Sequence, residues 1–449
     1  MPALWLLLVA LVVAGAAIAN KLPVPNAVIW CVLGFTVAFI PGFPAVKFDP
    51  NIALYLFLPP LVYSSAVELP WPEFRDNLRP IAMLAVGLVV LTTAIVAVVA
   101  HFLMGFPWPV ATVLGAVLSP TDPVAASAIA SRVGMPRRLV AILEGEGLVN
   151  DAVSLTIFRI ALTATVGGAF SLGNGVERFF AILILEPLYG WLLGIAVARL
   201  RARITDARME IAVSLLTPFA AYLLPEHLGG SGILATVATG MYIGEQRSTL
   251  VPAGTRLHAT SVWEMIVFLL NGILFLTAGM ELRNVIVSSS AGVRVVSWGI
   301  AIAATVALVR LGWSAAHKYG MRALRIAFGW ERHQTPTRYM AVIAWSGMRG
   351  PISLAAALSI PASVSGKPFP DFQLILFTTA VVIVATLVVQ GTALGPLVQV
   401  LGVSKDAQRD KRNWKSSNCL GRSKRRGRLS KSFSPCKPRD WFRRMSRSG

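Results

Sequence analysis

Residues Ser119–Phe158 read SPTDPVAASAIASRVGMPRRLVAILEGEGLVNDAVSLTIF, and they place acidic side chains inside segments that otherwise have the composition of membrane-spanning helices. These acidic residues are Asp122, Glu144, Glu146 and Asp151. A charged side chain in the hydrocarbon core of a bilayer costs several kcal/mol, and proteins keep such residues mainly along ion and proton pathways. The stretch therefore predicts a pathway for ions or protons.

The whole-chain composition is that of a polytopic membrane protein. Of 449 residues, 55% are hydrophobic and 14% are charged, whereas a soluble domain carries about 25% charged residues. The first apolar segment has no basic region before it, so we expect a first span and no cleavable signal peptide. The three cysteines, Cys31, Cys419 and Cys436, indicate neither a disulfide framework nor a metal site.

The apolar segments predict an all-α fold with about 13 transmembrane helices. A helix needs about 20 residues to cross the hydrocarbon core, and Pro or Gly within it is tolerated where neighbours satisfy the freed backbone groups. The predicted spans are residues 3–19, 25–41, 51–67, 80–104, 108–131, 139–166, 178–199, 209–224, 230–243, 262–281, 292–316, 338–361 and 372–401.

Basic residues predict the orientation of these spans. If the N-terminus is outside, the inside loops hold 17 Lys and Arg and the outside loops hold five. Cytoplasmic loops carry the excess of Lys and Arg. We therefore expect an outside N-terminus and a cytoplasmic C-terminal tail. The expected location, which these residues do not decide, is the plasma membrane (the inner membrane of a bacterium).

Two of the predicted spans are interrupted in the middle by helix-breaking residues. The fifth carries Ser119–Pro123 and the twelfth carries Ser346–Pro351. Pro removes a backbone donor, and broken helices at matching places in two halves of a transporter indicate a binding site near the midplane. The two spans cross in opposite directions, which predicts an inverted repeat of spans 1–6 and 8–13 with the broken helices crossing at the midplane.

Asp151 is the predicted shared binding site for a cation and a proton. At about 100° per residue, Asp151, Ser154 and Glu144 share one helical face, and Glu146 shares another with Asn150. A carboxylate in a medium of low dielectric holds a proton tightly, while an approaching cation favours the charged form. A site that accepts either ion, but not both, is the minimal device for exchange.

Thr121 and Asp122 interrupt the fifth span. An unwound segment exposes carbonyl oxygens and two half-helix ends, and oxygen atoms suit hard cations such as Na⁺. Asp122 is therefore interpreted either as part of the ion site or as an N-cap that only compensates a half-helix end.

Three arginines lie within predicted spans. A buried guanidinium needs a carboxylate partner, so Arg349 is expected to pair with Glu146 as a structural ion pair between the two halves. Arg159 is expected to meet an acid such as Glu144 or Glu186, and Arg310 to extend toward the membrane interface.

Several motifs together resemble the sodium/proton antiporters of the monovalent cation:proton antiporter-1 family. The motifs are Thr121-Asp122-Pro123, Gly134–Arg138, Glu146–Asp151, Leu58–Leu61, Phe275–Met280 and Gly347–Gly350. The resemblance covers about residues 5–402. Each motif alone is weak, but the Glu-x-x-x-Asn-Asp run combined with a Thr-Asp-Pro break and a later Gly-x-Arg-Gly is specific.

The resemblance implies the sodium/proton antiporter fold and one-for-one exchange of H⁺ for Na⁺, or for K⁺ or Li⁺, by elevator-like alternating access. It implies a mobile core at about 80–166 and 292–401, and a dimerisation scaffold at about 1–67 and 178–281. It also implies a homodimer that is not an enzyme and needs no cofactor beyond the transported ions.

The resemblance also implies roles for single residues. Asp151 carries the ion or proton, Asn150 orients the site, and Glu146 pairs with Arg349. Thr121 and Asp122 supply or support ion-facing oxygens. Two departures, Gly147 where many members have Ser and Ser64 where some have an acid, leave the preference for Na⁺ over K⁺ open.

Two other functions are alternatives. A passive monovalent cation channel is one, although paired broken helices with buried carboxylates favour a two-state carrier. An intramembrane hydrolase is the other, with Ser231 in Gly229–Gly232 as nucleophile and His258 or His317 as base. Neither histidine lies within a predicted span.

Residues 403–449 carry 16 Lys and Arg against three Asp and show no hydrophobic period. This composition predicts a disordered cytoplasmic tail attracted to anionic lipid, or an abnormal end produced by a shifted reading frame. Nucleic-acid binding is not expected, because a basic tail beside a membrane explains the charge more simply.

Overall fold

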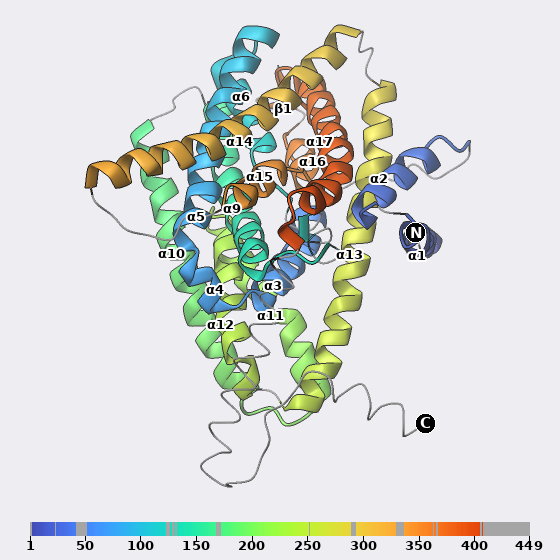
Figure 1. Ribbon diagram of the computed structural model, residues 1–449. Coiled ribbons are helices and arrows are strands. Elements are labelled where there is room, and N and C mark those ends of the chain that lie inside the picture. Colours follow the sequence, from blue (N-terminus) through green and yellow to red (C-terminus); the bar gives the residue numbers. More distant parts are fainter. Residues whose placement is uncertain are drawn as a thin grey trace.

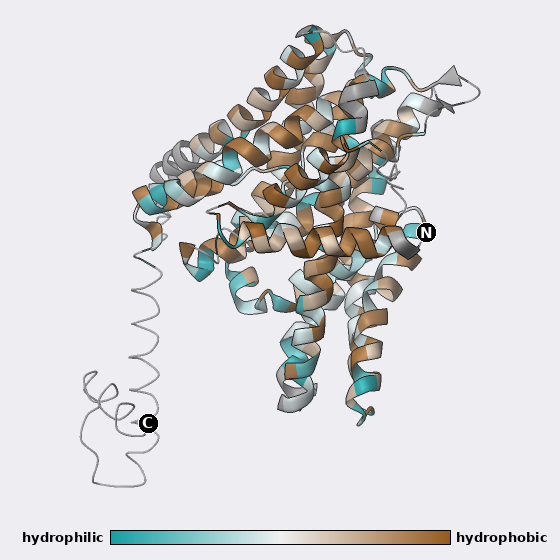
Figure 2. Ribbon diagram, turned by 90° about the vertical axis from the view of Figure 1, so that its right-hand side faces the viewer, coloured by the Kyte–Doolittle hydropathy of each residue, from teal (hydrophilic) through white to brown (hydrophobic). Residues whose placement is uncertain are grey.

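The protein is a bundle of helices in the computed structural model (Figure 1). The structure describes residues 2–22, 24–41, 52–122, 126–127, 130, 133–167, 172–250, 252–288, 293–328, 336–361, 363–364, 367–404 and 406. Within these residues, seven helices are long and apolar enough to cross a membrane, and three apolar helices are shorter. Figure 2 shows that hydrophobic residues run along most of the helices, and many large apolar side chains are exposed on the outside of the bundle. The protein is therefore membrane-spanning.

The helices follow the predicted spans. Their bounds are α1 (Pro2–Ala19), α2 (Asn26–Val37), the π-helix η1 (Ile52–Phe57), α3 (Leu58–Glu68), α4 (Trp71–Asp76), α5 (Leu78–Ala82), the π-helix η2 (Met83–Leu88), α6 (Val89–Met104), α7 (Trp108–Leu118), α9 (Arg137–Gly167), α10 (Leu172–Arg201), α11 (Ala207–His227), α12 (Ile233–Leu250), α13 (Ala253–Ser288), α14 (Val293–Phe328), α15 (Thr337–Trp345), α16 (Pro351–Leu358) and α17 (Phe372–Val400). The short strands β1 (Ser363–Val364) and β2 (Lys367–Pro368) pair antiparallel, with Val364 opposite Lys367.

The two interruptions occur where the sequence predicts them. Helix α7 ends at Leu118, and residues 119–122 are not helical. Helix α15 ends at Trp345, and α16 begins at Pro351, which suits the first helical turn because its missing N–H needs no partner there. Residues 123–125, and with them the last part of the first predicted break, lie outside the described residues, as does most of the predicted tail.

Several helices extend past the apolar segments that predicted them. Helix α13 spans Ala253–Ser288 where residues 262–281 were expected, and α14 spans Val293–Phe328 where residues 292–316 were expected. The length of an apolar segment matches the thickness of the hydrocarbon core, but the helix continues beyond it because polar residues also form backbone hydrogen bonds. The expected boundaries were therefore too short at these two helices.

Glycines allow close contacts between helices of the predicted scaffold. Helix α13 packs on α2, and α12 packs on α10 and α3 (Figure 1). A Cβ atom added to Gly279 would lie 2.0 Å from the Cys31 carbonyl oxygen, and one added to Gly190 would lie 2.1 Å from the Ala235 carbonyl oxygen. Small residues at such positions let membrane helices approach backbone to backbone. These helix pairs therefore form tightly packed units.

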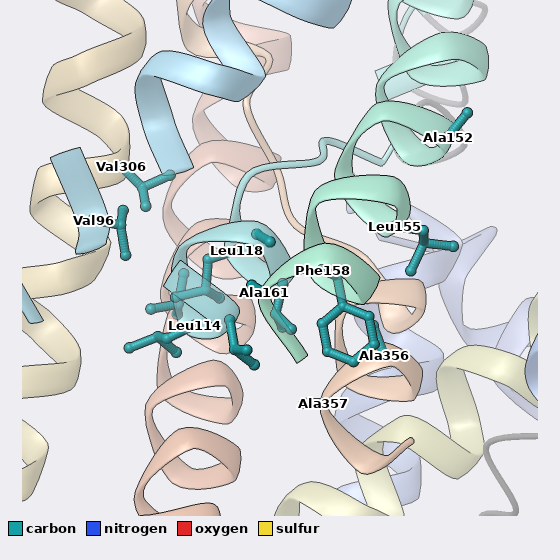
Figure 3. Close-up of a cluster of buried hydrophobic side chains, with 14 of the residues drawn as sticks. Val96, Leu114, Leu118, Ala152, Leu155, Phe158, Ala161, Val306, Ala356 and Ala357 are labelled. Carbon is teal, nitrogen blue, oxygen red and sulfur yellow. The ribbon is translucent and has the colours of Figure 1, made fainter. Parts of the chain in front are cut away.

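The predicted core is built around α7 and α9, which pack against each other and against α6, and α7 also packs against α16. Figure 3 shows the apolar side chains between them, including Leu114 and Leu118 of α7, Phe158 of α9, and Ala356 of α16. Apolar packing around α7, which leads into the first break, holds the polar residues of this region inside the bundle.

We predict that Gly279→Ala destabilises the protein, because its methyl group would overlap the backbone of α2. Overpacking of this kind costs about 1–3 kcal/mol. The melting temperature of the purified protein in detergent should fall by several degrees. Gly312→Ala on α14 is the matched control, because nothing lies within 4 Å of the position its methyl group would take. Equal melting temperatures for both variants would contradict a tight contact between α2 and α13.

Candidate functional site

The two interrupted helices meet at their breaks. The backbone N–H of Asp122 donates a hydrogen bond to the carbonyl oxygen of Met348 at 2.8 Å. A Cβ atom added to Gly350 would lie 2.7 Å from Asp122 Oδ2 and 2.8 Å from Asp122 Cβ. Glycine is therefore required for the Asp122 side chain to lie against the second break. The predicted crossing of the two breaks is confirmed.

Each break supplies a charged side chain to a helix end of the other. Arg349, in the second break, donates from Nε to the carbonyl oxygen of Leu118 at 2.6 Å, and Leu118 is the last residue of α7. Asp122, in the first break, lies against Gly350, the residue before the first turn of α16. A cation is favourable at a helix C-terminus and an anion at an N-terminus, so both half-helix ends are compensated.

Helix α9 brings the predicted polar residues to the first break. Asn150 Nδ2 donates to Thr121 Oγ1 at 2.8 Å and to the Thr121 carbonyl oxygen at 3.3 Å. Thr121 Oγ1 donates to Glu146 Oε1 at 3.1 Å. One turn further along α9, Ser154 Oγ donates to the Ala116 carbonyl oxygen at 2.8 Å. The structure therefore joins Thr121, Asn150, Glu146 and Ser154 to one crossing.

Asp151 is buried at the same crossing, with 5% of its surface exposed. Asn150, the residue before it, bonds to Thr121, the residue before Asp122, so both acids belong to this crossing. Within the described part of the chain, no salt bridge joins Asp151 to a cationic side chain, and Asn150 Oδ1 is a buried acceptor with no hydrogen-bond partner. The site is therefore rich in oxygen atoms and negative in charge, as a site for a hard cation or a proton must be.

The predicted pair of Glu146 with Arg349 is wrong. Glu146 instead pairs with Arg310 of α14, through Nη1 to Oε1 at 2.5 Å and Nη2 to Oε2 at 2.9 Å. Arg349 donates to the carbonyl oxygens of Leu118 and Gly347. A Cβ atom on Gly347 would lie 2.6 Å from Arg310 Cδ, so the glycine makes room for this arginine.

Arg310 is therefore the site residue that the sequence analysis missed. Its side chain is 2% exposed, and its Nε also donates to the Ile343 carbonyl oxygen at 3.0 Å, so it does not extend to the interface as expected. The available signal was its position within an apolar span, which it shared with Arg349. The sequence alone could not rank the two arginines by their distance from Glu146.

The predicted partners of Arg159 are also wrong. Arg159 donates to the Glu226 carboxylate and to the Gly230 carbonyl oxygen. Glu186 instead accepts hydrogen bonds from the Ser231 N–H at 2.5 Å and from the Ser231 hydroxyl at 3.2 Å. Ser231 is fully buried, and its hydroxyl donates to the Glu186 carboxylate. Within the described residues it is therefore not the accessible hydroxyl beside a histidine that a hydrolase nucleophile needs.

The chain is similar to known exchangers along most of its length. Residues 7–400 match the family described as "Sodium/hydrogen exchanger, transmembrane". An uncharacterized Na⁺/H⁺ exchanger of Mycobacterium tuberculosis (strain H37Rv) is 36% identical over 407 residues, which are 89% of this chain and 74% of that protein. A sodium, potassium, lithium and rubidium/H⁺ antiporter of Bacillus pumilus is 33% identical, over 90% of this chain and 61% of that protein.

Solved structures share the fold. The sodium proton antiporter MjNhaP1 of Methanocaldococcus jannaschii superposes with a TM-score of 0.69, covering 89% of this chain and 98% of the other. The identity is 18%, so this likeness concerns the fold alone. The expected antiporter fold and the family resemblance are confirmed.

We predict that Arg310→Ala strongly destabilises the protein, because Glu146 would remain buried without its partner. Breaking a buried pair costs about 3–5 kcal/mol, whereas replacing both partners by apolar residues is often neutral. Thermal unfolding in detergent should show a large loss for Arg310→Ala and recovery in Glu146→Leu/Arg310→Met. Arg208→Ala, at an exposed position, is the control. If Arg310→Ala had the same melting temperature as Arg208→Ala, this would contradict a stabilising ion pair between Glu146 and Arg310.

Proposed function

This chain belongs to the sodium/hydrogen exchanger family, and we propose that it exchanges protons for a monovalent cation across the membrane with Asp151 as the shared site. The proposal rests on one difference between two buried acids on α9, which is whether a cationic side chain pairs with them. Glu146 is neutralised by the Arg310 guanidinium, whereas Asp151 has no salt bridge within the described residues. Of these two carboxylates, Asp151 is therefore the one that remains available to bind a proton or a transported cation.

Competition at one carboxylate explains coupling. Two nearby carboxylates in a medium of low dielectric resist being charged together, so Asp151 beside Asp122 needs a positive charge. Either a proton or a cation supplies it. When one ion occupies the site the other is excluded, and the carrier moves across the membrane with one of them. This gives exchange without a cofactor.

The proposed cation ligands are Asp151 and Thr121, with Asn150, Asp122 and Ser154 in support. Asn150 Oδ1 has no hydrogen-bond partner within the described residues, and Ser154 Oγ keeps acceptor capacity after donating to Ala116. Na⁺ is the proposed substrate, with K⁺ and Li⁺ as the alternatives. The name of the Bacillus pumilus relative, which gives sodium, potassium, lithium and rubidium, supports a comparison of several cations.

The proposed arrangement has a core at about 80–166 and 292–401 that moves against a scaffold at about 1–67 and 178–281. The backbone contacts of Gly279 and Gly190 join helices inside the scaffold, and Gly115 makes a similar contact with Thr93 inside the core. These contacts resist separation within each unit. We further propose a homodimer in the plasma membrane with the N-terminus outside, supported by the family resemblance and the distribution of basic residues.

We predict that Asp151→Asn abolishes exchange, because an amide does not bind and release a proton in the pH range of the assay. The protein should be placed in vesicles that contain a pH-sensitive dye and carry an imposed proton gradient. Added Na⁺, K⁺ or Li⁺ should dissipate the gradient with the parent protein and not with the variant. Asp206→Asn, at the exposed N-cap of α11, is the control and should remain active. Exchange by the Asp151 variant would reject the site.

The same vesicles distinguish a carrier from a channel. A channel would pass cations electrogenically, with a membrane potential that follows the cation gradient. A one-for-one antiporter would dissipate the proton gradient equally with and without a clamped potential.

We predict that lowering the pH raises the apparent KM for the cation while kcat at saturating cation changes less. The physical reason is that protons and cations compete for one carboxylate, so binding of one weakens binding of the other by the same factor. The initial rate of dye response at several cation concentrations and pH values measures this. An apparent KM independent of pH would contradict a shared site.

A further inference from the structure

A second ionic cluster lies on α9, eight residues after Asp151. At a rise of about 1.5 Å per residue, it is about 12 Å further along the helix axis. Its cation is Arg159, and its acids are Glu226 at the end of α11 and Glu186 on α10. The proposed ion site does not use this cluster, so its charged groups need another explanation.

Arg159 joins the predicted core to the predicted scaffold. Its guanidinium donates to the Glu226 carboxylate and to the carbonyl oxygen of Gly230, in the connection between α11 and α12. Tyr55 of η1 donates to the same Glu226 carboxylate at 3.4 Å. A residue on the helix that carries Asp151 is thus held by groups on α11 and in the α11–α12 connection, and η1 supports one of these groups.

The groups that receive Arg159 are themselves fixed to the scaffold. The Glu186 carboxylate accepts from the N–H and hydroxyl of Ser231, and Arg178 donates to the Gly229 carbonyl oxygen at 2.9 Å. A Cβ atom on Gly230 would lie 2.3 Å from Glu186 Oε1, so the connection lies directly on α10. The acceptors therefore belong to a rigid part of the scaffold.

Two other buried ion pairs have a different placement. Arg310 and Glu146 join two core helices, and Arg201 and Glu210 join two scaffold helices. These pairs hold each unit together. The Arg159 pair crosses between the units, and the Arg159 side chain is 31% exposed where Glu226 is 7% exposed. It therefore lies at the edge of the contact between α9 and the scaffold, and not inside it.

We propose that Arg159 is a positioning residue that latches α9, and with it Asp151, to the scaffold, and that this latch opens in each transport cycle. The inference rests on the proposed function, because it needs a core that moves against the scaffold. A discrete pair that is either made or broken gives two distinct positions rather than a continuous range. The latch stabilises the position seen in this structure.

Cross-linking tests whether the latch must open. The parent protein carries Cys31→Ala, Cys419→Ser and Cys436→Ser. Arg159→Cys/Glu226→Cys is added, and a short membrane-permeant bis-methanethiosulfonate reagent links the two thiols. We expect exchange in the vesicle assay to stop on linking and to return with a reductant.

The matched control is Tyr189→Cys/Ala220→Cys on α10 and α11, both scaffold helices that a hydrogen bond between these residues joins in the native protein. Linking this pair should leave exchange unchanged. Full activity of the linked Arg159/Glu226 pair overturns the latch. A parent protein without cation-dependent proton flux overturns the proposed function, and the latch with it.

A second measurement uses Arg159→Gln and needs no cross-linking. The variant removes the positive charge of Arg159 and so weakens the latch. Weakening the latch disfavours one position of the core, so the apparent KM for the cation should rise on one side of the membrane and fall on the other. Glu226→Gln should act in the same direction, and the double variant should add little to either single one. If the apparent KM on each side of the membrane were the same in the variant as in the parent protein, the latch would be overturned.

Discussion

The structure depends on a contact between two interrupted helices in the middle of a membrane-embedded bundle. An interrupted helix leaves backbone groups without partners, and the hydrocarbon region offers no water to satisfy them. Here each break supplies hydrogen-bond partners or a charged side chain to the backbone groups at the other break. Met348 accepts from the Asp122 N–H, Leu118 accepts from the Arg349 guanidinium, and the Asp122 side chain lies at the first turn of α16. Without this exchange the breaks would be too costly to keep.

The crossing then controls which acid on α9 is available to an ion. Thr121 and Asn150 tie α9 to the first break, and Arg310 neutralises Glu146 through two hydrogen bonds. Asp151, one residue after Asn150, is held at the same depth without such a partner in the described chain. Two nearby positions on α9 thus differ: Glu146 lies in an ion pair, and Asp151, the proposed ion site, has no salt bridge within the described residues.

Packing in the rest of the bundle relies on close glycine contacts and on buried ion pairs. Both kinds of contact join helices within the proposed scaffold and within the proposed core. The contact of α9 with the α11–α12 connection differs, because it is made by one long side chain that is partly exposed. A contact of this kind can be lost and remade without repacking apolar side chains, which suits the boundary between the two units that we propose to move.

The sequence by itself determined the spans, the two breaks and the polar face of α9. Hydrophobic length and helix-breaking Pro and Gly are local properties, and the helical period places Asp151 and Asn150 relative to Glu146 before any packing is known. The motifs also indicated the family. Only the tertiary structure decided that Glu146 pairs with Arg310 and that Arg159 reaches Glu226. Such partners depend on how helices are rotated and how deeply they pack, and details such as the space left by Gly347 are set by segments far apart in the chain.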